Sequence, residues 1–201
     1  MIVVVDYGMG NLRSVSKALE HLGGKVKVSS SPSDIKKADK LVLPGVGAFG
    51  DACEELSARN LTKPITEFIG SRKPFLGICL GLQLLFEESE ESPGVRGLGI
   101  YPGKVQRFRS SNIKIPHMGW NDVRIVNGHP LLKGIVSGSF FYFVHSYYAV
   151  PEDPALTVCE TVCGEEKFAA MIGTKTTFAT QFHPEKSQAA GLALLKNFLA
   201  W

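Results

Sequence analysis

The sequence predicts an α/β protein, with an open, mostly parallel sheet, helices on both faces and added antiparallel β-ribbons. Strand-like and helix-like stretches alternate through the first half of the chain, which is typical of parallel strands joined by helical crossovers. From about residue 103 to 170, short β-rich runs are instead separated by Gly, Pro, Asn and Asp. These residues favour the turns between antiparallel strands, so the second half is expected to extend the sheet with ribbons.

The first half supplies the parallel strands and their helices. The apolar run "MIVVVDY" is typical of a strand covered on both faces, and "KVKVSS", "KLVLPGVG" and "PFLGIC" predict three more. Leu and Val recur at helical spacing over residues 11–22, and a Gly-Gly pair then ends the pattern. "DACEELSARN" and "TKPITEFIGS" predict two further helices.

The second half is expected to form ribbons from "GKVQRF", "SFFYFVHSYYAV", "ALTVCETV" and "KFAAMIG". The core strand "TTFATQF" follows, and then a last helix from about Gln188 with Leu192, Leu195 and Leu199 facing inward. The "EESEES" run after Phe86 is typical of a solvated helix end. No repeat or linker is visible, so residues 1–201 are interpreted as one domain.

Composition excludes several classes of function. The net charge of +3 is small and Lys and Arg are scattered, which argues against nucleic-acid binding. No apolar run is long enough for a membrane span, and the first residues lack the pattern of a signal peptide. The four cysteines show no disulfide-framework spacing, which suits a reducing compartment. A cytoplasmic protein is expected.

One cysteine stands in a pattern that indicates a nucleophile. An apolar strand runs into Cys79 and a helix is expected at once, so residues 77–81 form a G-x-C-x-G strand–turn–helix. Glycines flank such a turn because a side chain would collide with the neighbouring backbone. The Leu80 N–H would face a developing oxyanion, and a helix N-terminus favours a thiolate. Taken alone, the pattern also fits a buried, inert thiol.

"FATQFHPEKS" supplies a base for this thiol. His183 follows a core strand at the sheet edge that also carries Cys79, where functional groups of open α/β sheets gather. Pro184 restricts His183 to extended geometry, and Glu185 can accept a hydrogen bond from one ring nitrogen. His-x-Glu also occurs in zinc nucleobase deaminases, but their C-x-x-C half is missing here.

The other cysteines lack this context, and no metal is expected. Cys53, Cys159 and Cys163 are interpreted as core or surface thiols. Cys159 and Cys163 could form half of a metal site, but no second Cys/His pair stands at ligand spacing.

The stretches "GICLGLQLLF" and "QFHPEKS" make the chain resemble the class I glutamine amidotransferases over nearly its whole length. The resemblance implies a flavodoxin-like sheet. "DYGMGNLRSV", "LPGVGAFGDA", "PHMGWNDV" and "YFVHSYYAV" narrow the resemblance to the members of histidine biosynthesis. The resemblance implies glutamine as substrate, no cofactor, and Cys79 as nucleophile. It also implies His183 as general base and then acid, Glu185 as its orienter, and Gln83 as a substrate ligand.

The same resemblance suggests the remaining site residues. Many class I relatives carry a Gly-Gly-Pro-Gly type oxyanion strand where this chain has "PGVG", and this strand looks able to flip. Val46 would then present its N–H to the oxyanion only in the activated state, next to Gly47 and Leu80. Further substrate contacts are expected from Glu91 and from the backbone of His145, Ser146 and Tyr147.

A partner should collect the ammonia, and the resemblance implies that this heterodimer partner is a (β/α)8-barrel cyclase subunit. Met118 and Trp120 in "PHMGWN" are candidate docking anchors, although local core is the alternative. Asn11 is expected at the same interface, and Tyr142 where ammonia crosses. Three other functions stay open: a glutaminase of anthranilate or aminodeoxychorismate synthesis, a non-catalytic module on the same scaffold, and a related cysteine peptidase.

Overall fold

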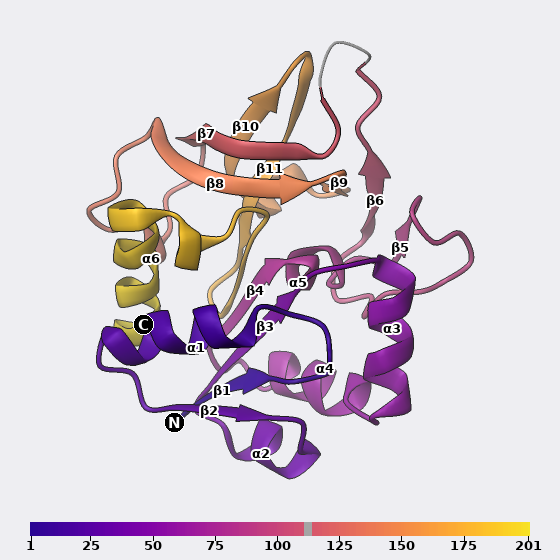
Figure 1. The fold of residues 1–201 in the computed structure, drawn as a ribbon, viewed down its shortest axis with the longest axis vertical. Coiled ribbons are helices and arrows are strands. Elements are labelled where there is room, and N and C mark those ends of the chain that lie inside the picture. Colours follow the sequence, from indigo (N-terminus) through magenta and orange to yellow (C-terminus); the bar gives the residue numbers. More distant parts are fainter. Residues whose placement is uncertain (111–113) are drawn as a thin grey trace.

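The computed structural model describes residues 1–110 and 114–201 and confirms the predicted α/β class (Figure 1). The main sheet runs β2-β1-β3-β4-β12-β11-β10-β7-β8, and its first five strands in that order pair in parallel. These strands are β1 (Ile2–Val5), β2 (Val26–Ser29), β3 (Lys40–Gly45), β4 (Phe75–Cys79) and β12 (Thr177–Thr180).

The antiparallel strands extend the sheet beyond β12, as the turn-rich second half predicts. They are β11 (Glu166–Gly173), β10 (Thr157–Cys163), β7 (His117–Ile125) and β8 (Ser139–His145). A smaller sheet holds β5 (Glu88–Ser89), β6 (Gly103–Arg107) and β9 (Tyr147–Pro151). The "SFFYFVHSYYAV" run is therefore two strands in different sheets, divided at Ser146.

Helices cover both faces of the parallel strands because each strand buries alternate side chains on opposite sides. In β1, Val3 and Val5 join one apolar cluster, and Ile2 and Val4 join the other. Side chains of α2, α3 and α4 pack into the first cluster, and those of α1 and α6 into the second. The helices are α1 (Leu12–His21), α2 (Pro32–Lys37), α3 (Phe49–Ala58), α4 (Thr62–Gly70), α5 (Leu80–Gln83) and α6 (Gln188–Ala200). Short 3-10 turns are η1 (Pro130–Leu132), η2 (Pro154–Leu156) and η3 (Pro184–Lys186).

Two local predictions were wrong. In α6, Leu195 is buried as expected, but Leu192 and Leu199 are only partly buried. The buried stripe consists of Gly191, Leu194, Leu195 and Phe198. The expected stripe was shifted in phase, because apolar residues occupy almost every position of this helix and periodicity cannot choose among them.

The "EESEES" run is not a helix end. The helix after Cys79 stops at Gln83, and the carbonyls of residues 84–86 accept hydrogen bonds from residues 98–101 instead of from a next turn. This arrangement buries Leu84, Leu85 and Phe86 together, which a regular helix on the surface could not do. Glu88–Ser89 then pairs with β6.

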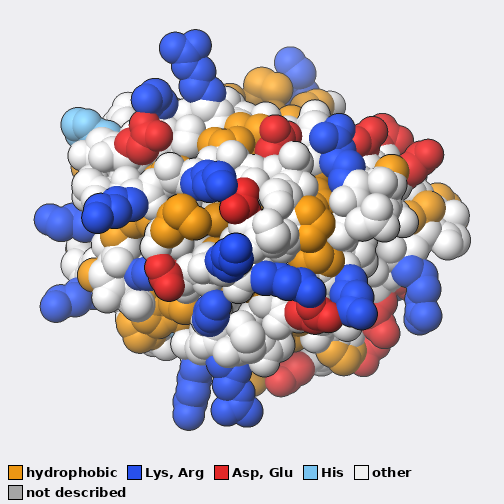
Figure 2. All heavy atoms as spheres, turned by 90° about the horizontal axis from the view of Figure 1, so that it is seen from below, with side chains coloured by type: hydrophobic (Ala, Val, Ile, Leu, Met, Phe, Trp, Pro, Cys, Tyr) orange, Lys and Arg blue, Asp and Glu red, His pale blue; other side chains and the backbone are white. Residues whose placement is uncertain are grey.

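The surface agrees with the small net charge. On the face shown in Figure 2, Lys and Arg side chains are interspersed with Asp and Glu. Within the described residues, no helix is both long and apolar enough to cross a membrane.

Candidate active site

Cys79 occupies a strained turn between β4 and α5. Its backbone has φ +55° and ψ −106°, a left-handed conformation that costs a non-glycine residue about 1–3 kcal/mol. A Cβ on Gly81 would overlap the Leu43 carbonyl oxygen, and one on Gly77 would lie 2.7 Å from the Gly81 oxygen. The two glycines are therefore required for the tight packing of the turn, as the G-x-C-x-G pattern predicts.

The helix after Cys79 is shorter than expected. The sequence predicts a helix dipole behind the thiol. Because α5 is a single turn, few peptide dipoles are aligned there and their sum is small. Any favourable field at the sulfur must come mainly from groups in direct contact with it.

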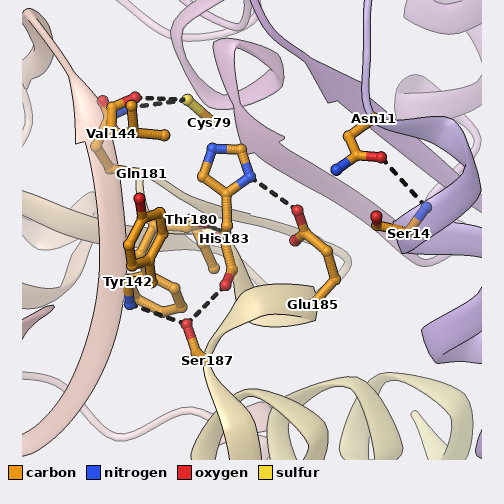
Figure 3. Close-up of polar contacts among 11 residues, drawn as sticks. Asn11, Ser14, Cys79, Tyr142, Val144, Thr180, Gln181, His183, Glu185 and Ser187 are labelled. Carbon is orange, nitrogen blue, oxygen red and sulfur yellow. Dashed lines mark hydrogen bonds and ion pairs between the residues drawn. The ribbon is translucent and has the colours of Figure 1, made fainter. Parts of the chain in front are cut away.

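Two hydrogen bonds to Val144 and Gln181 hold the sulfur (Figure 3). The Cys79 Sγ lies 3.9 Å from the Val144 carbonyl oxygen, to which the S–H donates. The Gln181 Nε2 donates to the same sulfur at 3.7 Å. The thiol is thus held from two sides, one by an acceptor and one by a donor.

His183 and Glu185 form a buried pair beside this thiol. The strand that precedes them, β12, lies next to β4, with Thr180 in register with Ile78. The Nδ1 of His183 donates to the Glu185 Oε1 at 2.9 Å, and the two side chains are 3% and 0% exposed. This hydrogen bond leaves Nε2 as the free nitrogen, and Nε2 is buried without a partner within the described structure.

The pKa of His183 is raised above its ordinary value. Burial by itself lowers it, but the Cys79 sulfur and the Glu185 carboxylate favour the imidazolium and outweigh burial. A histidine that gains a proton readily next to a thiol is suited to take the thiol's proton and later return it.

The backbone of His183 is fixed to β8. Its N–H donates to the Tyr142 carbonyl oxygen at 2.9 Å. The Ser187 Oγ donates to the His183 carbonyl oxygen at 2.6 Å and accepts from the Tyr142 N–H at 3.0 Å (Figure 3). Ser187 was missed from the sequence, where it reads only as the residue before the last helix.

A cavity of about 280 Å³ opens beside Cys79 and brings most of the predicted residues together. Its lining includes Val46, Gly47, Leu80, Gln83, Glu91, His145 and Ser146. Hollows of about 490 and 410 Å³ lie elsewhere, but they contain neither Cys79 nor His183. The smaller cavity is the candidate substrate site because it alone of these three joins the sulfur.

Tyr147 and Glu91 both carry hydrogen bonds that the sequence did not predict. Tyr147 does not line the cavity, and its carbonyl oxygen already accepts from Gln83 Nε2 at 2.9 Å and His145 Nδ1 at 2.8 Å. Glu91 lines the cavity, but one carboxylate oxygen accepts from the Phe49 N–H at 2.8 Å, at the first turn of α3. The structure thus gives Glu91 a helix-capping contact that the sequence did not predict.

His145 is a buried neutral histidine. Burial lowers its pKa to about 3, so the ring carries one proton at neutral pH. That proton lies on Nδ1, which donates to the Tyr147 carbonyl, and Nε2 accepts from His117 Nδ1 at 3.2 Å. Both nitrogens are therefore engaged, which disfavours His145 as a second base.

The predicted partner residues fall into two groups. Met118 and Trp120, both on β7, are 62% and 45% exposed, so they are not local core. The Tyr142 ring packs edge-on against Trp120, with centroids 6.1 Å apart. Asn11 lies at the start of α1 and caps it, its Oδ1 accepting from the Ser14 N–H at 3.4 Å.

Within the described ranges, no group of three His, Cys, Asp or Glu side chains is placed to hold a metal ion. Cys53, Cys159 and Cys163 are free thiols that do not line the cavity beside Cys79, and burial raises the pKa of each.

Comparisons place this chain and its fold in a known class. PurLQS from Thermotoga maritima matches with a TM-score of 0.77 and 21% identity, over 99% of this chain and 97% of that one. The glutaminase domain of Trypanosoma brucei CTPS matches with a TM-score of 0.67 and 16% identity, over 99% and 93%. These likenesses show the fold. Residues 3–201 match the family glutamine amidotransferase class-I, and the chain belongs to that family.

Sequence relatives identify the branch. The imidazole glycerol phosphate synthase subunits HisH of Syntrophotalea carbinolica and Nitrosococcus oceani are each 52% identical, covering 98% and 100% of this chain and 98% and 97% of the relative. That of Pyrococcus furiosus is 50% identical over 98% and 97%. The chain is thus a glutaminase subunit of the HisH type, serving histidine biosynthesis. These matches argue against a glutaminase of another pathway, a non-catalytic module and a cysteine peptidase.

Proposed function

We propose that Cys79, His183 and Glu185 hydrolyse glutamine to glutamate and ammonia in this chain, which acts as one amidotransferase domain over residues 1–201. The observation that carries the assignment concerns His183, which follows β12 and lies beside the strand that ends in Cys79: its Nε2 is buried and has no hydrogen-bond partner among the described residues. An unsatisfied buried polar atom is costly, and here it lies where a proton must be exchanged.

The reaction proceeds in two halves. The Cys79 thiol transfers its proton to His183 Nε2, and the sulfur's electron pair attacks the amide carbon of the glutamine side chain. His183 then protonates the departing nitrogen, ammonia leaves, and a thioester remains. Water, losing a proton to His183, attacks the thioester and releases glutamate and the thiol. Glu185 keeps the Nδ1 proton in place throughout.

Backbone N–H groups of Leu80 and of the PGVG segment hold the oxyanion in this mechanism. Losing such a donor typically costs about 2.7–4 kcal/mol of transition-state stabilisation. Gly47 has φ +100° and borders the cavity, which supports a segment able to change conformation without side-chain strain. Val46 would supply its N–H in the activated conformation. Substrate contacts come from Gln83 and from the cavity wall at His145 and Ser146.

The product ammonia passes to the other synthase subunit, which we propose is a (β/α)8-barrel cyclase bound as a heterodimer in the cytoplasm. It would use ammonia to form imidazole glycerol phosphate and an aminoimidazole carboxamide ribotide. The exposed side chains of Met118 and Trp120 on β7 support docking there, since apolar anchors of this kind are typical of interfaces. Tyr142 packs on Trp120 and hydrogen-bonds to the His183 backbone, so it joins this surface to the base. Asn11 is proposed at the edge of the same interface.

Glutamate release tests the proposal. The chain is assayed alone, and then with a barrel cyclase and its ribotide ligand, with Cys79→Ala beside both. Stimulation by the partner that disappears in Cys79→Ala is the expected result. Glutaminase activity that survives in Cys79→Ala would overturn the nucleophile assignment, and full activity without the partner would overturn the gated oxyanion segment.

A further inference from the structure

Gln181 is a fully buried amide that the mechanism above does not use. It directly follows β12 and has no exposed surface, although its side chain is polar. Its backbone N–H donates to the Ala170 carbonyl oxygen at 2.9 Å, which fixes the residue in the extended sheet. Its side chain reaches two residues of the candidate site, Cys79 and Gln83.

The hydrogen bonds fix which end of this amide faces the sulfur. The Tyr147 carbonyl can only accept, so the Gln83 NH₂ group must point to it, at 2.9 Å. The same NH₂ group donates to the Gln181 Oε1 at 3.3 Å. The opposite end of Gln181, its NH₂ group, therefore lies at 3.7 Å from the Cys79 sulfur and donates to it.

We propose that Gln181 is a further residue of the glutaminase reaction, one that holds the Cys79 sulfur through its side-chain N–H and binds the thiolate more strongly than the thiol. As a thiol, Cys79 points its proton at Val144. Once that proton has moved to His183, the Val144 carbonyl has no donor, while the Gln181 N–H gains a charged acceptor. Hydrogen bonds to charged groups are the stronger ones.

This role compensates for the short helix behind the thiol. The one-turn α5 offers little dipole, so a direct donor in a buried setting is the larger influence on the sulfur. The same amide also ties the nucleophile to Gln83, the proposed substrate ligand. The inference rests on the proposed function, because it takes Cys79 as the nucleophile.

The test measures the sulfur directly, without glutamine or the partner subunit. Iodoacetamide alkylation of Cys79 is followed as a function of pH by mass spectrometry, which separates Cys79 from the other cysteines. Gln181→Met removes the donor and keeps much of the volume, and Gln181→Glu keeps the shape but presents a carboxylate. Gln106→Met is the matched control, because Gln106 is a partly buried glutamine that contacts Tyr148 and not the sulfur. Thermal unfolding checks that each variant is folded.

No variant removes a titratable group that faces the sulfur, and only Gln181→Glu adds one. The titratable groups around the sulfur are His183 after β12, Tyr7 after β1, and Glu91 and His145 in the cavity wall. We expect Gln181→Met to slow Cys79 alkylation about tenfold at neutral pH and to move the profile to higher pH by about one unit. Gln181→Glu is expected to slow it further, and Gln106→Met to leave it unchanged.

The result that overturns the inference is a folded Gln181→Met whose alkylation profile coincides with that of the unsubstituted protein. Gln181 would then be a structural amide only. Failure of the proposed function has a different signature: Cys79→Ala would retain partner-stimulated glutaminase activity, whatever the alkylation profiles show.

Discussion

Burial of a neutral His145 predicts that the protein loses stability in mild acid. The ring carries one proton in the folded state down to a pKa of about 3, because burial disfavours the imidazolium. In the unfolded chain, a histidine titrates near its ordinary pKa of about 6.5. Between these two values the unfolded state binds more protons, so stability rises with pH and falls as acid is added.

The size of the effect follows from the shift. Each pH unit below about 6.5 removes about 1.4 kcal/mol from the free energy of unfolding, so lowering the pH from about 8 to about 5 costs about 2 kcal/mol. The groups that face His145 are His117, which donates to its Nε2, and His183. Both favour the neutral form of His145 and so act in the same direction.

Urea unfolding at about pH 8 and about pH 5 measures this contribution, with His145→Gln as the perturbation. The other titrating groups contribute equally to the free energy of unfolding of the protein and of the variant, so they cancel in the difference between the two. That difference should change by about 2 kcal/mol between the two pH values, with the variant less sensitive to acid. His21→Gln, an exposed histidine on α1, controls for the loss of a histidine as such. Parallel pH dependences for the protein and His145→Gln would show that His145 is not the source of the acid sensitivity.

Three further predictions concern the site. Gly81→Ala should lower the free energy of unfolding by about 1–3 kcal/mol or more, because its Cβ would overlap the backbone of β3; Gly70→Ala, with open space around it, should not, and urea unfolding compares the two. Tyr7→Phe should leave that free energy unchanged or raise it by about 1 kcal/mol, since the buried hydroxyl has no partner within the described structure; a loss of stability would contradict this. Glu185→Gln should lower kcat about a hundredfold or more and shift the pH–rate profile to lower pH, because the carboxylate raises the pKa of His183; an unchanged profile in steady-state assays would count against the pair.

Local patterns predicted most of the fold. The apolar runs of β1, β3 and β4 are short, bounded by turn residues and too continuous for a surface helix, so their assignment was secure. The phase of α6 was not, because that helix is apolar on nearly every side. The one-turn length of α5 depends on backbone pairing with residues 98–101, which no local pattern reveals.

The candidate site divides in the same way. Cys79, His183 and Glu185 stand in motifs whose spacing carries a mechanism, so the sequence could point to them. Gln181 and Ser187 belong to no such motif, and they contact the site only because the fold brings them there. The one available signal for Gln181 was a polar residue at the end of the apolar run "TTFATQF", which is costly to bury unless it is hydrogen-bonded. Its partners, Cys79 and Gln83, come from a different strand and helix, and only the structure brings them together.

The most direct test of the central claim is to catch the covalent intermediate. The complex with the cyclase subunit is mixed with glutamine, quenched rapidly in acid and digested, and the peptides are examined by mass spectrometry. The expected product is a glutamyl thioester on the peptide that carries Cys79, formed before glutamate is released and absent in Cys79→Ala. Glutamate released with no adduct on Cys79 at any time, or with an adduct on another residue, would contradict it.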